Sequence, residues 1–128
     1  MYALMLAAVV AMTLATTAAT PVISTVVQRE KEAELEFRLR QYREAIKRYR
    51  ADHDRYPQRL EDLLLDTTVL QRRRYLRRLY QDPMTGRVDW RLVIGAPTDA
   101  SSGIEDLHSR STATALRVTP GKTTYGDW

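Results

Sequence analysis

The sequence has no cysteine, and it has no charged residue before Arg29. The first absence excludes disulfides, thiol nucleophiles and metal sites built from cysteine, so an exported form of this protein must fold without a covalent crosslink. The second absence leaves a long uncharged segment, MYALMLAAVVAMTLATTAATPVISTVVQ, at the start of the sequence. Because a helix needs roughly 20 apolar residues to cross a hydrocarbon core, this segment is long enough to span a membrane.

Residues 1–28 form this uncharged segment and are called the stem. A cleavable secretory signal is one alternative, but no Lys or Arg precedes the apolar run, and only Ala18-Ala19-Thr20 resembles a cleavage site. An ordinary membrane anchor is a second alternative. The stem is rich in Ala and Thr and is interrupted by Pro21, which favours a helix that packs closely against copies of itself.

The larger apolar side chains of the stem are expected to pack in the core of an assembly. Pro21 and the threonines before it predict a break in the helix between about Ala15 and Pro21 after assembly, because proline removes a backbone donor and clashes with the preceding turn. The predicted packing residues are Leu4, Leu6, Val9, Val10, Leu14, Pro21, Val22 and Val26.

Residues 29–128 are called the head and are long enough for one small domain. The chain has 20 Lys plus Arg against 16 Asp plus Glu, which is a formal charge of +4. Much of the positive excess lies in residues 38–50 and 72–78.

The first part of the head has apolar residues at alternating spacings of four and three, the pattern of an amphipathic helix. Acidic residues four positions before arginines support its exposed side: Glu34 with Arg38, Glu36 with Arg40, and Glu44 with Arg48. No turn signal separates this region from the stem. The sequence therefore predicts one helix from near the N-terminus to about Asp52, about 75 Å long.

Shorter elements are expected after a break that ends at Pro57. A short helix is predicted around Leu60 and Leu63, strands are predicted over 88–94 and 103–109, and the tail after residue 110 is expected to be irregular surface. The predicted fold class is α+β, with a long helical stem and a small head of short helices and a small antiparallel sheet. The predicted head core comprises Leu35, Leu39, Tyr42, Ile46, Tyr49, Leu60, Leu63, Leu76, Leu79 and Trp90.

Several segments together resemble the type IV pilin-like proteins, and among them the major pseudopilin of type II secretion. The uncharged N-terminal helix carries a proline, here Pro21, and the head carries four similar segments in the expected order. These are YPQRLEDLL at 56–64, YLRRLYQDPMTGRVDW at 75–90, GIEDLHSRS at 103–111 and the closing YGDW.

The resemblance implies a structural subunit that waits in the inner membrane and is assembled into a helical homo-oligomeric filament, periplasmic or extracellular. It also implies a prepilin peptidase and an inner-membrane assembly machinery as partners. A secretion pseudopilus and a surface pilus both remain open. One departure concerns Met5, which stands where the family's Phe-Thr-Leu-Ile-Glu-like run has its glutamate, so the N-terminal amine of a neighbour must be buried in another way.

A calcium site is the second departure. Members of the pseudopilin family often hold calcium in the loop after the second strand, but the corresponding SRSTATALR has no acidic residue. Calcium prefers six to eight oxygen ligands with several carboxylates among them. We therefore expect no cofactor; the alternative is a calcium site at Asp99, Glu105 and Asp106.

The other patterns of polar residues favour structural roles over catalysis or metal binding. His53 lies between two aspartates at the predicted end of the helix. His108 and Ser109 are adjacent in a predicted strand, so their side chains would lie on opposite faces of it. Neither pattern predicts a catalytic or metal site. In a pilin-like head, RRRYLRR at 72–78 is expected to be a helix with Leu76 and Leu79 inward and its arginines in solvent or on a neighbouring subunit. We expect neither enzymatic activity nor nucleic-acid binding.

A second class of function stays open. In it, the stem is only a membrane anchor, and the head binds a ligand or an anionic polymer through its arginine-rich face. Filament formation distinguishes this class from the first.

Overall fold

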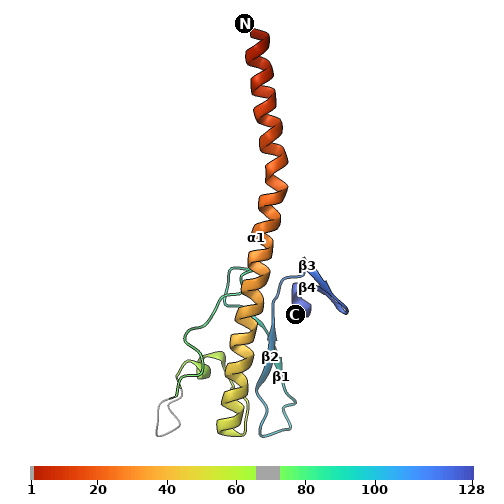
Figure 1. The fold of residues 1–128 in the computed structure, drawn as a ribbon. Coiled ribbons are helices and arrows are strands. Elements are labelled where there is room, and N and C mark those ends of the chain that lie inside the picture. The colour runs from red at the N-terminus through yellow and green to blue at the C-terminus, as the bar shows by residue number, and fades with distance from the viewer. Residues whose placement is uncertain (1, 66–72) are drawn as a thin grey trace.

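A computed structural model of the chain describes the backbone of residues 2–65 and 73–128, and the side chains of residues 23–65 and 73–128. In Figure 1 one helix projects far beyond the head, and the other elements gather around its second half, so the fold is α+β. The elements are α1 (Tyr2–His53), the 3₁₀ turn η1 (Leu60–Leu63), β1 (Arg91–Ile94), β2 (Ile104–His108), β3 (Thr114–Thr119), β4 (Lys122–Thr124) and the 3₁₀ turn η2 (Tyr125–Asp127).

Helix α1 is continuous over 52 residues and ends one residue beyond the predicted Asp52. Asp54 follows with a φ of 55° and donates its backbone N–H to the carbonyl of Arg50 at 2.9 Å. A residue in the left-handed conformation just past the last turn is a common way to end a helix, and Asp tolerates it. The predicted break near Pro21 concerns assembled subunits and stays a prediction.

One face of α1 is buried in the head. Its core residues recur at helical spacing, and none exceeds 5% exposure: Leu35, Leu39, Tyr42, Ile46 and Tyr49. Against them pack buried residues from the rest of the head, namely Leu63, Leu76, Trp90, Ile104, Leu107, Ala115 and Tyr125. Leu60 and Leu79 are partly buried against the same cluster. Every residue of the predicted head core therefore lies in the core or against it.

Tyr42 lies at the centre of this core. Its hydroxyl donates to the carbonyl oxygen of Tyr80 at 2.8 Å, and the indole N–H of Trp90 donates to the same oxygen at 2.9 Å. The Tyr42 ring also makes edge contacts with the rings of Tyr80 and Trp90, at centroid distances of 6.1 and 5.5 Å. Burial raises the pKa of Tyr42 to about 12, so the hydroxyl is a donor throughout the physiological range.

The arginine-rich segment is not the helix that we predicted. Residues 73–81 have no helical hydrogen bonding, and the backbone N–H groups of Tyr75 and Leu76 both donate to the carbonyl of Leu63, at 3.0 and 2.9 Å. Leu76 is buried at 3% exposure. Bonds to η1 and the core thus take the backbone groups that a local helix would use, so tertiary contacts override the helix propensity of this segment.

The turn before β1 is organised by Asp82, whose side chain is fully buried. Its carboxylate accepts hydrogen bonds from the Ser109 hydroxyl at 2.5 Å and from the backbone N–H of Met84 at 2.9 Å. Its own N–H donates to the carbonyl of Arg87 at 2.8 Å, and Gly86 takes a φ of 72° to close the turn. The carboxylate thereby connects this turn to the end of β2.

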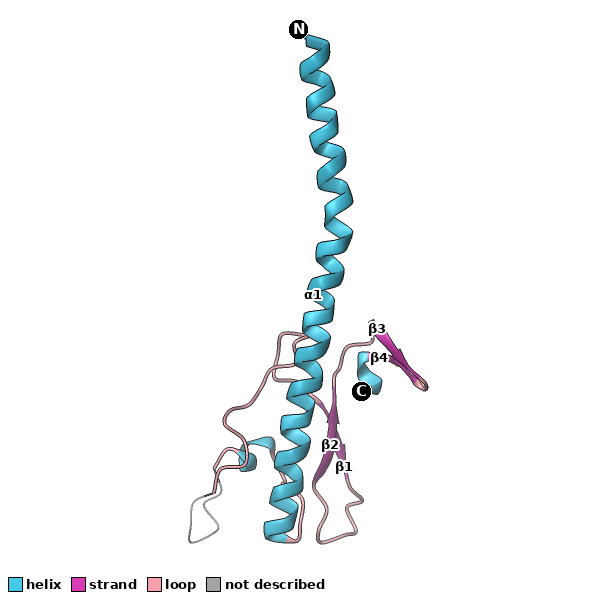
Figure 2. Cartoon of the chain, viewed as in Figure 1, coloured by secondary structure: helices cyan, strands magenta, loops and turns pink. Residues whose placement is uncertain are grey.

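Strands β1 and β2 form an antiparallel pair in which Leu92 faces Leu107, with a bulge between Val93 and Ile94. Both strands are shorter than the predicted 88–94 and 103–109. Figure 2 shows this pair on the side of α1 that also carries β3 and β4.

The tail is not irregular, as we had predicted, but forms the β3–β4 hairpin followed by η2. Thr119 pairs with Lys122 across Pro120 and Gly121, and Gly121 has a φ of 77°. Proline followed by a glycine at positive φ is the pattern of a type II turn, and threonine favours strands. The prediction was wrong because we took residues that also favour strands and a tight turn as signs of irregular structure.

Gly103 gives a test of how the loop before β2 is packed. A Cβ atom there would lie 2.7 Å from the carbonyl oxygens of both Tyr56 and Pro57. These are backbone atoms, which cannot move without shifting the chain. Gly103→Ala is therefore expected to destabilise the head by about 1–3 kcal/mol in urea unfolding. Gly95→Ala is the control, because its Cβ would meet only the flexible end of Glu105. Equal stability of the two variants would contradict this packing.

Candidate functional site

The part of α1 that leaves the head carries exposed apolar side chains. Ile23, Val26 and Val27 are 62%, 51% and 44% exposed, although all three are β-branched residues that a head would normally bury. Val26 is a predicted stem-packing residue. The others, Leu4, Leu6, Val9, Val10, Leu14, Pro21 and Val22, lie outside the described side chains. In the part of the chain with described side chains, no helix is long and apolar enough to cross a bilayer.

A buried carboxylate joins α1 to the C-terminal hairpin where the head begins. Glu32 is only 6% exposed and accepts hydrogen bonds from the backbone N–H of Leu116 at 2.5 Å and from the hydroxyl of Tyr125 at 2.8 Å. The Tyr125 hydroxyl accepts in turn from the Gln28 amide at 2.7 Å. The pKa of Tyr125 is raised, chiefly by burial. The Tyr125 hydroxyl therefore keeps its proton and can donate it in the hydrogen bond to Glu32.

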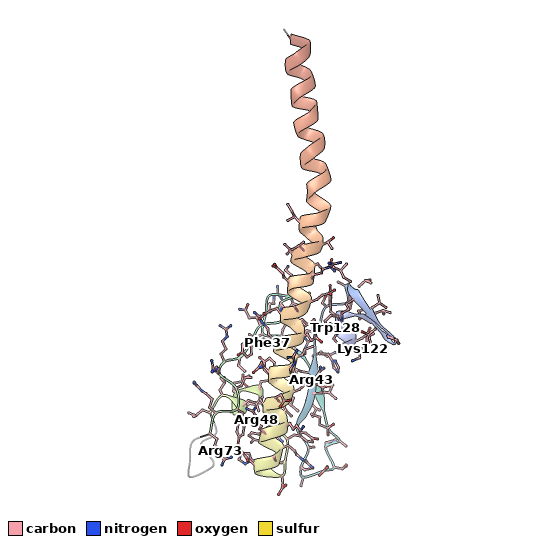
Figure 3. All side chains as sticks on the ribbon, in the orientation of Figure 1. Phe37, Arg43, Arg48, Arg73, Lys122 and Trp128 are labelled. Carbon is pink, nitrogen blue, oxygen red and sulfur yellow. The ribbon has the colours of Figure 1, made fainter. Side chains whose placement is uncertain are left out.

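Arg43 makes the second connection between α1 and the C-terminal part of the head. Its guanidinium donates to the Asp106 carboxylate at 2.8 Å and to the main-chain oxygens of Leu107 and Trp128, at 3.3 and 2.6 Å. One side chain of α1 thus holds both β2 and the residue that follows η2. Figure 3 shows Arg43 on α1 beside the part of the chain that carries Trp128 and Lys122.

A groove runs between α1 and the β3–β4 hairpin, in two adjoining parts with volumes of about 410 and 200 Å³. Trp128, Arg117 and Glu36 line both parts. The bond between Arg117 and Glu36 is 3.3 Å long and exposed to solvent, so it holds the groove only weakly. Apart from Glu32 and Thr119, the remaining lining side chains are apolar or cationic: Ala33, Leu39, Leu116, Arg29, Arg43 and Lys122. This surface is called the side groove.

The calcium alternative required Asp99, Glu105 and Asp106 to come together. Asp99 instead accepts from the backbone N–H of Ser101 at 2.9 Å, and Asp106 is bound to Arg43. Among the described residues, no group of three or more carboxylate, histidine or cysteine side chains could hold a metal ion. The expectation that the protein needs no cofactor stays a prediction.

The histidines lie in structural surroundings. His53 stacks on Tyr49 with a centroid distance of 4.3 Å, at the end of α1. His108 Nε2 lies 3.7 Å from Asp106, and burial lowers its pKa. Ser109, its neighbour, is buried and donates to Asp82 instead.

The described arginines of 72–78 are exposed, and Arg73 bonds Asp52 at 2.9 Å. The Tyr75 hydroxyl donates to the same carboxylate at 2.7 Å, and this bond is the main reason why the pKa of Asp52 is lowered. Figure 3 shows Arg73 on the far side of α1 from Trp128. The arginine-rich segment and the side groove are therefore separate surfaces.

Comparisons of the chain with protein-family models, with curated proteins and with solved structures find no match.

Three polar residues that matter in the head were missed by the sequence analysis: Glu32, Arg43 and Asp82. A signal existed for the first, because counting back from Leu39 and Leu35 at helical spacing reaches Glu32 and then Gln28 on the buried stripe. Arg43 and Asp82 gave no such signal. Their partners are distant in sequence and are brought near only by the fold.

Glu32 provides a test of how the hairpin is held. Glu32→Ala would leave the N–H of Leu116 without its acceptor, and we expect a loss of about 1–3 kcal/mol in urea unfolding. Hydrogen exchange should become faster in β3 and β4. Glu36→Ala, one turn away on the same helix, removes only the exposed bond to Arg117 and should change little. Equal effects of the two substitutions would argue against a special role for Glu32.

A calcium chelator is expected to leave the thermal unfolding of the full chain unchanged, because Asp99 and Asp106 are engaged separately. The measurement compares the melting temperature with and without excess calcium after chelation. A drop of about 10 °C on chelation would correspond to more than 1 kcal/mol of stabilisation by the ion and would reveal a site.

Proposed function

We propose that this chain is the structural subunit of a helical pilin-like filament that is assembled from the inner membrane through its stem. The observation that carries the proposal is the division of α1. The helix is one continuous element, but its second half is built into the head core while its first half projects. The projecting segment contains no Asp, Glu, Lys or Arg before Arg29.

The projecting half of α1 exposes apolar surface that must be shielded from water. Exposed apolar surface next to a folded head must be covered by lipid or by other apolar surfaces, and Ile23, Val26 and Val27 begin such a surface at the head. Exchanging lipid for other stems retains most of the apolar burial, so one segment can serve both the membrane and a filament. The small residues of the stem support close packing between copies.

The head segments support the same proposal through their resemblance to pseudopilins. YPQRLEDLL contributes buried Pro57 and Leu63, and the QDPMTG turn is held by Asp82. These segments have structural roles here and contain no arrangement that points to catalysis. A secretion pseudopilus and a surface pilus are equally compatible with them.

Substitutions that place a charge in the stem test the proposal. Val9→Asp or Val26→Asp puts an unpaired carboxylate into a bundle core or bilayer, at a cost of about 2.5–3.5 kcal/mol on insertion scales when central. We expect fibres in sheared material from cells to disappear in negative-stain microscopy. Val88→Asp makes the same chemical change at a half-exposed valine of the head and should leave fibres intact.

Two outcomes would count against the proposal. Normal fibres from both stem variants would show that the stem is not the element that assembles. An absence of fibres from the unmodified protein, with the chain retained in membranes, would instead favour the anchored binding module.

A further inference from the structure

The segment that contains β2 and the loop before it is acidic. Residues 92–109 contain Asp99, Glu105 and Asp106 and no Lys or Arg. Asp106 is paired with Arg43, but Asp99 and Glu105 are exposed. Ile94, at the end of β1, is 66% exposed and lies in the same region. Residues 94–105 thus form an acidic loop with an apolar residue at its edge, called the acidic end. Hydrogen bonds from Ser101 and the nearby charge of Arg50 on α1 lower the pKa of Asp99, so its carboxylate is charged.

The acidic end lies where α1 stops. The N–H of Tyr56 donates to the carbonyl of Ser101 at 3.0 Å, and the N–H of Ile104 donates to the carbonyl of Pro57 at 2.8 Å. These bonds place the loop beside the residues that follow His53. In Figure 1 the connection between β1 and β2 lies at the end of the head farthest from the stem.

The side groove begins at the opposite end of the head, where the stem starts, and extends along α1 to Arg43. Its helical wall is formed by residues of the first turns of the head, including Arg29 and Ala33. About 20 helical residues separate Ala33 from His53, which corresponds to about 30 Å along α1. The stem end of the side groove is therefore far from the acidic end of the same chain, whereas its other end reaches Arg43, which is bonded to Asp106 next to Glu105.

The side groove has cations available for a partner. Arg29 and Lys122 make no ion pair among the described residues. Arg117 has a long, exposed bond to Glu36 and lies 6.0 Å from the ring centroid of Trp128. Of the two groove acids, Glu32 is already engaged by Leu116 and Tyr125. The indole of Trp128 and the side chain of Leu116 add apolar surface that Ile94 complements.

We propose that the acidic end of one copy docks in the side groove of the next copy, with Asp99 and Glu105 facing Arg29 and Lys122. This proposal rests on the filament function and names a head-to-head contact within it. Two different surfaces of one molecule make a heterologous contact, which generates an open helix when the rotation does not close a ring. The contact sets the register between heads, while the stems supply most of the apolar burial.

Charge exchange tests the contact in the full chain. An acidic-end variant, Asp99→Lys with Glu105→Lys, and a groove variant, Arg29→Glu with Lys122→Glu, each bring like charges together. Each is expected to reduce sedimentable filament by roughly tenfold. Thermal unfolding should be unchanged in the groove variant and slightly lowered in the acidic-end variant, which loses the hydrogen bond from Ser101 to Asp99. Combining all four substitutions restores opposite charges and should restore filaments. Loss without rescue would overturn the pairing.

The absence of native cysteine allows a direct second measurement. Ala33→Cys in the groove wall with Ala100→Cys in the acidic end should give a ladder of disulfide-linked copies after mild oxidation, because only Cα atoms within about 7 Å can be bridged. Ala33→Cys with Ala51→Cys is the matched control, with the second cysteine on the exposed face of α1 at the same end of the head, and should give no ladder.

The outcomes separate this contact from the proposed function. Filaments from the unmodified chain, without a ladder and without an effect of charge exchange, would overturn the contact and leave the filament proposal standing. Failure of the unmodified chain to form filaments, with no ladder, would overturn both.

Discussion

The burial of one face of α1 is the constraint on which the rest of the head depends. Leu35, Leu39, Tyr42, Ile46 and Tyr49 present a single apolar stripe, and the other parts of the core are placed by contact with it. At its centre, Tyr42 and Trp90 both donate to the carbonyl of Tyr80. Because burying an unpaired carbonyl or hydroxyl is costly, this shared acceptor fixes the path of an otherwise irregular segment.

Polar side chains then attach the segments that the apolar stripe does not hold. Glu32 binds the hairpin, Arg43 binds β2 and the residue after η2, and Asp82 binds the turn before β1 to Ser109. Each of these groups has several hydrogen-bond partners. Hydrogen bonds depend on direction whereas apolar contacts do not, so these bonds select one arrangement of the segments around the core. A head that has no disulfide, and whose sheets are two-stranded in the described residues, gains its particular arrangement from such connections.

Helix α1 also connects the head to the stem, which is the segment proposed to assemble. Its second half is amphipathic because it faces both the core and water, whereas the segment before Arg29 has no charge to present to water. The connection is a continuous helix, so the head and the stem share one axis near the point where they meet. The proposed contact between the acidic end and the side groove of neighbouring copies rests on this shared axis, because the acidic end and the stem end of the groove are displaced from each other along it.

The sequence by itself determined the features that repeat locally along the chain. The spacing of Leu35 to Tyr49 predicted the helix and its buried face, and the pattern of residues 103–109 predicted a strand, in which Ile104 and Leu107 are buried. Periodicity carries this information because adjacent turns of a helix and alternate residues of a strand share a face.

Tertiary structure decided the rest. It kept residues 73–81 out of a helix because their backbone bonds go to Leu63 and Tyr42, and it brought Thr114–Asp127 onto α1 through Glu32, a partner more than 80 residues away. Those hydrogen bonds join residues with no local pattern in common, so only the folded chain shows that they exist.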